Sequence, residues 1–363
     1  MKGLCVAALV LACTGAAATA AAHPVPFSYL DIRVLGGAPG VIDVTLVAHI
    51  FDVAHDLGID PAERLLDPAV LQAQASMIAA LFDGRLRIEA DGRPLAGTWS
   101  APEGLPDRNS VQRRGRFNVT QSPATLVVTA GLFPYDPAHQ TFVNFYEHDA
   151  IASQVILDQG HPRFEYFTGS PRGLLAVARR FVWDGVRHML TGPDHLVFLI
   201  GLLLLGGTRR RLFVVVTAFT LAHAVSLSLA AFGVFSPRSR LIEPAIALVI
   251  VYVGVDNLLV RDGRDMRAWI AVVFGLIHGF GFANVLRAME LSRRALGWSL
   301  VSLHVGLEIS QLFLVVGIAG SLAVVKSRSE WAGRQLAVAG SVGVMAAGTF
   351  WFIQRVFFPG GIS

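Results

Sequence analysis

Residues 212–235 read LFVVVTAFTLAHAVSLSLAAFGVF, an uninterrupted apolar stretch with no acidic residue, lysine or arginine. A helix needs about 20 consecutive apolar residues to cross the hydrocarbon core of a bilayer. The stretch therefore predicts a transmembrane helix, and this decides the class of the fold. Five more apolar segments predict further membrane helices: 194–207, 241–260, 268–286, 296–325 and 335–358. Segment 194–207 is short for a complete span, so we expect it to begin in the interfacial region.

Composition divides the chain into two parts. Hydrophobic residues make up 53% of the chain and charged residues 15%, whereas soluble proteins carry about 25% charged residues. The shortage of charge is confined to 190–358, which indicates a multi-domain chain: a β-sandwich-like, strand-rich domain at 23–168, then an all-α membrane bundle of about six helices at 191–358. The net charge of +4 does not indicate nucleic-acid binding, because most basic residues of the membrane half fall in loops.

The N-terminus has the pattern of a secretory signal peptide over residues 1–22. Lys2 supplies the positive end and residues 4–12 the apolar run, and small residues form the cleavage site. Cys5 and Cys13 both lie inside this segment. The mature chain would therefore contain no cysteine for disulfides or thiolate metal sites.

Cleavage after Ala20-Ala21-Ala22 would make His23 the first residue of the mature chain. Its α-amine and ring nitrogen can then chelate one metal together, and copper(II) suits such nitrogen ligands. The alternative is that His23 has no role, because any residue can follow a signal-peptide site.

Residues 27–157 contain short β-branched and aromatic runs separated by turn signals such as Pro39-Gly40 and Asp91-Gly92. Helical spacing of apolar residues, opened by Asp60-Pro61 and running to Phe82, predicts one helix among them. We expect a small antiparallel sandwich with one inserted helix and no catalytic motif. The predicted strands are Phe27–Leu35, Ile42–Ala48, Leu86–Ala90, Arg116–Thr120, Thr125–Thr129 and Thr141–Tyr146.

Residues 170–190 predict an amphipathic helix at the membrane surface, with an apolar face that includes Phe181 and a face rich in arginine. Loop charges then predict the orientation of the bundle. Nine basic residues lie on one side, at 209–211, 261–267 and 326–334, and five on the other, at 238–240 and 287–294. The larger set belongs in the cytoplasm. We therefore predict a multi-pass protein of the bacterial inner membrane, with its N-terminal domain and C-terminus in the periplasm.

Ionisable side chains within lipid are costly and mark functional sites. Most of those in this chain fall at the outer surface or at mid-depth of their spans, as judged from the helical rise, so they could line one cavity open to the periplasm. Asp256 alone falls toward the cytoplasm. The set comprises His188, Asp194, His195, His223, Glu243, Asp256, His278, His304 and Glu308.

Neutral imidazoles and carboxylates bind zinc, nickel, copper or iron, and without thiolates the residues leave this choice open. We predict a divalent metal held by three histidines, with three carboxylates as further ligands or partners: His195, His223 and His278, with Asp194, Glu243 and Glu308. Structural roles are the alternatives. Thr191-Gly192-Pro193-Asp194 and Glu243-Pro244 have the form of helix starts, and the glycines at 275–281 allow close helix packing.

Five blocks follow one another along the membrane half: HMLTGPDHLVF at 188–198, TAFTLAHAVSL at 217–227, EPAIAL at 243–248, GLIHGFGFA at 275–283 and GLEISQL at 306–312. Together they resemble the HupE/UreJ family, membrane proteins associated with hydrogenase and urease maturation. The resemblance extends to the longer family branch, which carries a secreted N-terminal domain. It implies handling of a transition metal, usually nickel, with metalloenzyme maturation proteins as candidate partners. Asn and Gly are expected where His304 and Ser310 stand, which leaves His304 the least secure ligand.

Three functions remain open at this point. The first is transport or delivery of a transition metal, most naturally nickel, through the cavity, with the outer domain capturing or presenting the ion. The second is an intramembrane zinc hydrolase, with Glu308 or Asp194 as general base. The third is a structural or assembly protein whose polar residues join helices.

Overall fold

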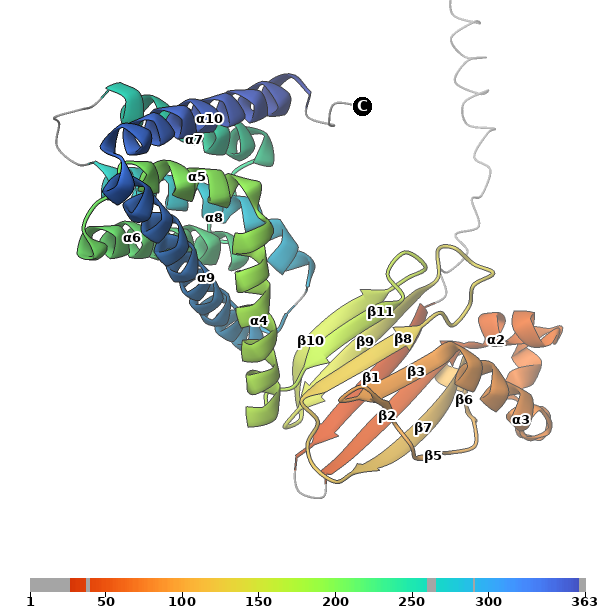
Figure 1. Ribbon diagram of the computed structural model, residues 1–363. Helices are drawn as coiled ribbons and strands as arrows, with labels where there is room; N and C mark the ends of the chain where they lie inside the picture. The colour runs from red at the N-terminus through yellow and green to blue at the C-terminus, as the bar shows by residue number, and fades with distance from the viewer. Residues whose placement is uncertain (1–26, 37–39, 260–265, 290, 359–363) are drawn as a thin grey trace, which may run out of the picture. The chain divides into compact units, whose positions relative to one another are not determined.

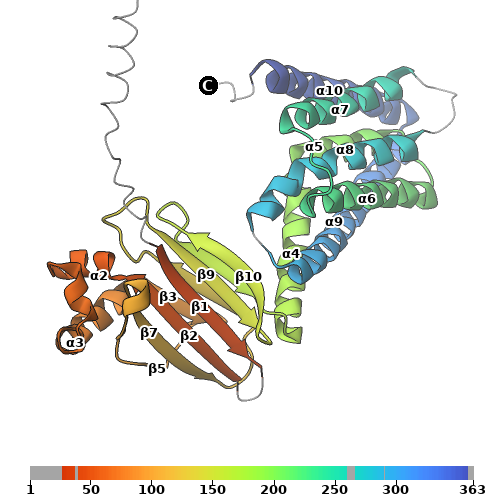
Figure 2. The ribbon, with the colours of Figure 1, turned by 180° about the vertical axis from the view of Figure 1, so that it is seen from behind.

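The computed structural model describes residues 27–36, 40–259, 266–289 and 291–358, which form a β-rich region followed by a helical region (Figure 1; Figure 2 gives the reverse view). The predicted fold class is confirmed. The predicted signal peptide and His23 lie outside the described residues. The chain divides into two compact units, and each is described by itself.

The β-rich region contains two sheets. The larger has the order β10-β9-β1-β2-β7-β5, with β6 also paired to β7, and the smaller has the order β11-β8-β3-β4. Alternate residues of β1 enter the core, so Leu30 and Ile32 are fully buried. The strands are β1 (Phe27–Leu35), β2 (Gly40–His49), β3 (Leu86–Ala90), β4 (Arg93–Pro94), β5 (Thr98–Trp99), β6 (Glu103–Leu105), β7 (Ser110–Val119), β8 (Thr125–Ala130), β9 (Gln140–Glu147), β10 (Ala150–Leu157) and β11 (Arg163–Phe167).

One strand pairing corrects the expectation of an antiparallel sandwich. β1 pairs antiparallel with β2, where Leu30 lies opposite Leu46, but parallel with β9, where Leu30 lies opposite Val143. After β8 the chain returns to the free edge of β1 as β9, which runs in the same direction as β1. Strands β10 and β11 were not predicted. In β10 the first five residues are not buried, so the hydrophobic alternation is weak.

Helix α3 (Pro68–Arg85) is the predicted helix, but it begins later than expected. The Asp67 side chain accepts a hydrogen bond from the Ala69 backbone nitrogen at 2.8 Å, and Pro68 occupies the first turn. Asp60-Pro61 precedes only a 3₁₀ turn, η1 (Ala62–Leu66). The expectation of a single helix opening at Asp60-Pro61 was therefore wrong.

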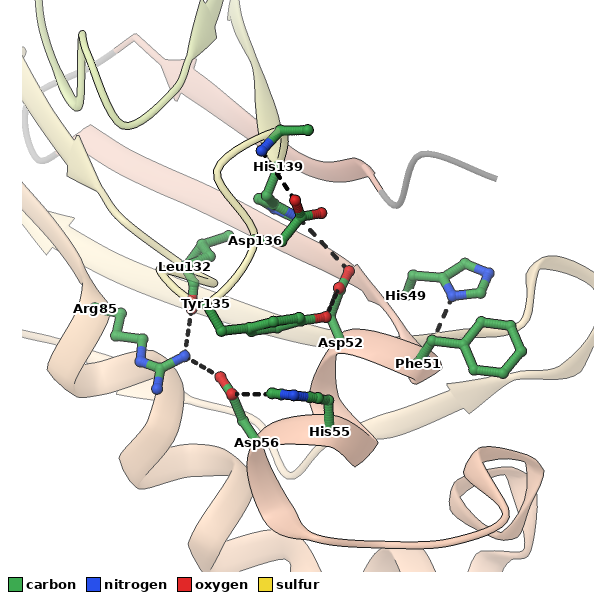
Figure 3. Close-up of polar contacts among 11 residues, drawn as sticks. His49, Phe51, Asp52, His55, Asp56, Arg85, Leu132, Tyr135, Asp136 and His139 are labelled. Atoms are coloured by element: carbon green, nitrogen blue, oxygen red, sulfur yellow. Dashed lines mark hydrogen bonds and ion pairs between the residues drawn. The ribbon is translucent and has the colours of Figure 1, made fainter. Parts of the chain in front are cut away.

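Helix α2 (Ile50–Leu57), which was also not predicted, follows β2 directly and contacts the loop 131–139 (Figure 3). The fully buried Asp52 accepts a hydrogen bond from the Tyr135 hydroxyl at 2.5 Å. Its other carboxylate oxygen lies 3.6 Å from Nδ1 of the buried His139. Burial lowers the pKa of His139 and raises the pKa of Asp52.

We expect His139 to make the β-rich unit sensitive to acid. Because its folded-state pKa is below the ordinary 6.5, its contribution to stability is present above that pH and is lost as the pH falls below it. The raised pKa of Asp52 acts in the opposite sense, so the comparison needs a His139→Leu variant. Between about pH 7.5 and pH 5.5, the melting temperature of the wild type should fall further than that of the variant. Equal shifts in thermal unfolding would contradict this prediction.

The helical region runs from α4 to α10. Among the described residues, five helices, α6 to α10, are long enough and apolar enough to cross a membrane. Helix α5, with 12 residues, is shorter. The short first segment is therefore as predicted. The helices are α4 (Pro171–Thr191), α5 (Pro193–Leu204), α6 (Arg209–Ala231), α7 (Ser239–Leu259), α8 (Arg267–Ala288), α9 (Arg293–Arg328) and α10 (Glu330–Phe357).

Helix α4 packs against α9 with their backbones in contact. A Cβ atom on Gly185 would collide with the Leu303 carbonyl, and one on Gly306 would collide with the Val182 carbonyl. This close approach brings the C-terminal turn of α4, which carries His188, beside the membrane helices. The predicted position of α4 at the membrane surface stays a prediction.

Candidate metal centre

Five imidazole rings gather in the helical region, each contributed by a different helix. The centroids of His195 and His278 are 4.0 Å apart, those of His188 and His195 are 4.7 Å apart, and those of His223 and His304 are 5.2 Å apart. His188 is half-buried and the other four are buried. The five are His188 of α4, His195 of α5, His223 of α6, His278 of α8 and His304 of α9.

Three of these histidines present ligand atoms close enough to share one ion. Nitrogen atoms of His188, His195 and His223 all lie within 4.8 Å of one another. Tetrahedral coordination at about 2.0–2.1 Å per nitrogen requires separations of about 3.3 Å, so small side-chain movements would close the site. His278, which packs against His195, is placed to supply a fourth nitrogen. The residues present therefore fit a metal.

The hydrogen bonding of the cluster also fits a metal. Within the part of the chain that the structure describes, five buried ring nitrogens of the cluster lack a hydrogen-bond partner: Nε2 of His188, both nitrogens of His195, Nε2 of His223 and Nδ1 of His278. A buried polar atom without a partner costs about 1–3 kcal/mol, and native proteins contain few of them. Coordination to a cation would satisfy those atoms that carry a lone pair.

Backbone contacts determine which nitrogen His223 presents to the cluster. The Leu300 carbonyl can only accept, so His304 donates to it from Nδ1–H at 2.6 Å. The Nε2 atom of a neutral His304 then carries a lone pair and accepts from Nδ1–H of His223 at 3.0 Å. Consequently the unpartnered Nε2 of His223 holds a lone pair available to a metal. This assigns His304 to orienting His223 rather than to direct ligation.

This arrangement predicts different effects for two substitutions of His304. His304→Ala removes the acceptor for His223 and should weaken metal binding about 10–100-fold. His304→Asn offers an amide oxygen at the same place and should retain most of the affinity. Metal titration of the two purified variants measures the difference. Equal losses in both would contradict the orienting role.

Glycines bring α8 against α6 at the level of the cluster. A Cβ atom on Gly279 would lie 2.6 Å from the His223 carbonyl oxygen, and one on Gly275 would lie 3.1 Å from the His223 backbone nitrogen. Only glycine permits this approach, which places His278 beside His223. The predicted packing role of the glycines is confirmed at these two positions.

Asp194 lies outside the histidine cluster. It forms an ion pair with Arg355 of α10, whose Nη2 lies 2.8 and 3.0 Å from the two carboxylate oxygens. Arg355 also donates from Nη1 to the Glu243 carbonyl, so it links α5, α7 and α10. The expected cap from Thr191 was wrong, since Thr191 ends α4 and donates to the Arg187 carbonyl. Sequence reasoning missed Arg355, whose only signal was a charge in the last apolar segment.

The remaining candidates also lie apart from the rings. Glu243 is exposed and sits inside α7, which begins at Ser239 and not at Glu243-Pro244 as expected. Glu308 accepts hydrogen bonds from Thr217 and Thr220 of α6 at 2.9 and 2.6 Å. Among the described residues, the group of histidine, cysteine, aspartate or glutamate ligand atoms that lie within 4.8 Å of one another consists of His188, His195 and His223, and it contains no carboxylate.

Breaking the ion pair between Asp194 and Arg355 should reduce stability. Both side chains are largely buried, so either Asp194→Asn or Arg355→Gln leaves the partner's charge uncompensated. Each substitution should lower the free energy of unfolding by about 3 kcal/mol. The double variant should lose less than the sum of the two. Denaturant unfolding of the four proteins checks this, and strict additivity would show that the two residues are not coupled.

Membrane-crossing helices around buried histidines define a multi-pass membrane protein with a candidate metal centre. The family model described as HupE / UreJ protein matches residues 170–355, more than half of the chain, and the chain therefore belongs to the HupE/UreJ family. The match includes all five clustered histidines, and membership indicates a metal-related accessory membrane protein. The resemblance inferred from the sequence is confirmed. A comparison with curated proteins found no match.

Proposed function

We propose that the protein transports or delivers a divalent transition metal, with nickel as the first candidate, across the inner membrane. The observation that carries this proposal is the set of five unpartnered nitrogens on four imidazoles from four helices. Imidazole suits nickel, zinc and copper. The family resemblance favours nickel among these three.

The predicted signal peptide and the loop charges support an orientation with the β-rich unit in the periplasm. His195 stands at the N-terminal end of α5, which then faces the periplasmic side. The metal would therefore reach the imidazoles from outside. The β-rich unit would capture it or present it there.

The two other functions receive less support. A zinc hydrolase needs a general base beside the metal-bound water, but Asp194 is held by Arg355 and Glu308 by threonines. A purely structural role for the histidines would require hydrogen bonds between helices. Of the rings, only His223 and His304 bond to each other, and most of the remaining nitrogens have no partner within the described residues.

Uptake of Ni²⁺ into proteoliposomes tests the proposal. Wild-type protein should carry Ni²⁺ inward, and His195→Ala should abolish the uptake because it removes the ring at the middle of the cluster. His161→Ala, which changes an exposed histidine of the β-rich unit, is the matched control. Uptake no faster than in empty vesicles, or full uptake by His195→Ala, would refute transport.

A further inference from the structure

A second polar group joins α6 to α9 beyond the histidine cluster. Thr217 and Thr220 of α6 contact the two carboxylate oxygens of Glu308, and Thr220 also lies 2.9 Å from Oε1 of Gln311. Thr220 and Gln311 are buried, while Thr217 and Glu308 are half-buried. Five oxygens meet here, two from a carboxylate, two from hydroxyls and one from an amide. We call these four residues the oxygen cluster.

The hydrogen atoms within the oxygen cluster do not match its contacts. The hydroxyl of Thr220 has one hydrogen, but it lies 2.6 Å from Oε2 of Glu308 and 2.9 Å from Oε1 of Gln311. Both of these oxygens are acceptors, so one of the two close contacts has no hydrogen to share. The Gln311 amide nitrogen is directed instead to Sδ of Met189 at 3.8 Å. A cation among the oxygens would remove this mismatch.

The oxygen cluster lies one helical turn from the imidazoles. Thr220 precedes His223 by three residues on α6, and Glu308 follows His304 by four on α9, so each pair shares a helix face. A cavity of about 10 Å³ is lined by one member of each group, His195 and Gln311, and otherwise by apolar side chains.

We propose that the oxygen cluster is a second binding site for the same divalent cation, which receives the ion from the imidazoles. The proposal rests on the transport function and supplies the inner part of its path, since α6 begins and α9 ends on the predicted cytoplasmic side. The Glu308 carboxylate offsets part of the charge of the ion within the membrane. Carboxylate, hydroxyl and amide oxygens hold transition metals less firmly than imidazole does. Conduction requires such a site, from which the ion can leave.

The contrast between the two carboxylates supports this assignment. Asp194 is compensated by the guanidinium of Arg355. Glu308 is held by neutral hydroxyls, and its negative charge therefore remains available to a cation. Thr220 faces two acceptors across this helix contact, in addition to the Val216 carbonyl of its own helix at 3.3 Å.

Equilibrium dialysis of full-length protein in nanodiscs against Ni²⁺, together with uptake into proteoliposomes, tests the second site. The wild type should bind two ions. Thr220→Val with Gln311→Leu keeps side-chain size but removes two oxygens, so it should bind one ion and take up Ni²⁺ at least about tenfold more slowly. The single variant Thr220→Ser keeps a hydroxyl at this position and should behave as the wild type.

Ser310→Ala is the matched control, because among the described residues the Ser310 hydroxyl bonds only to carbonyls of its own helix. Should the double variant fail to fold, Thr217→Val removes one half-buried oxygen and should weaken the second ion alone. A double variant with two ions and normal uptake overturns the second site but leaves the transport function intact. A wild type that binds one ion overturns it as well. A wild type with neither binding nor uptake refutes the transport function itself.

Discussion

Replacing His223 and His278 together by alanine should abolish stoichiometric metal binding at the histidine cluster while the protein remains folded and inserted. The change removes two of the unpartnered nitrogens that face the centre of the cluster, Nε2 of His223 and Nδ1 of His278. The two ligands that remain, His188 and His195, supply only half of a four-coordinate shell. Folding should persist, because the contact of α6 with α8 depends on Gly275 and Gly279, which are unchanged.

The metal content of the purified double variant, measured by mass spectrometry after loading with Ni²⁺, gives the result. His148→Ala with His161→Ala provides the control, since both are exposed histidines of the β-rich unit. The control should keep the wild-type content. If the variant with His223→Ala and His278→Ala also kept the wild-type metal content, the metal would be bound elsewhere.

Gly279→Ala should be strongly destabilising, although alanine is the better helix former. The added methyl group would lie 2.6 Å from the His223 carbonyl oxygen, so α8 must move away from α6. We expect a loss of about 1–3 kcal/mol in the free energy of unfolding. Metal affinity should fall with it, because the movement separates the rings of His223 and His278.

Gly343→Ala is the matched control for this prediction. Gly343 also lies in a membrane helix, but a Cβ atom there meets nothing within 4 Å. Its replacement should leave stability unchanged or raise it by less than about 1 kcal/mol. Thermal unfolding in detergent compares the two variants. Equal behaviour would mean that α6 and α8 do not require backbone contact.

Helices could be predicted from the sequence where the physical signal is local. Apolar length alone predicted the membrane helices, and the short α5 followed from the same criterion. In the β-rich region, the parallel pairing of β1 with β9 was missed because nothing in either strand encodes the identity of its neighbour. Helix α2 was missed because it follows β2 without a turn signal.

The candidate site was predictable in composition but not in detail. Helical depth correctly suggested that histidines of separate spans lie together, yet the predicted core of His195, His223 and His278 omitted His188. The structure places His188 within 4.8 Å of two of its neighbours because α4 packs closely on α9. The carboxylates were placed in the same cavity because depth says nothing about direction around a helix. Asp194 instead pairs with Arg355, far along the chain.

X-ray absorption of the purified, Ni²⁺-loaded protein tests the histidine centre most directly. The first coordination shell should contain nitrogen at about 2.0–2.1 Å, with the outer-shell scattering of several imidazoles and no sulfur. That signature should disappear in the variant lacking His223 and His278. A shell of oxygen alone, or an imidazole signature unchanged in that variant, would contradict a metal centre formed by these helices.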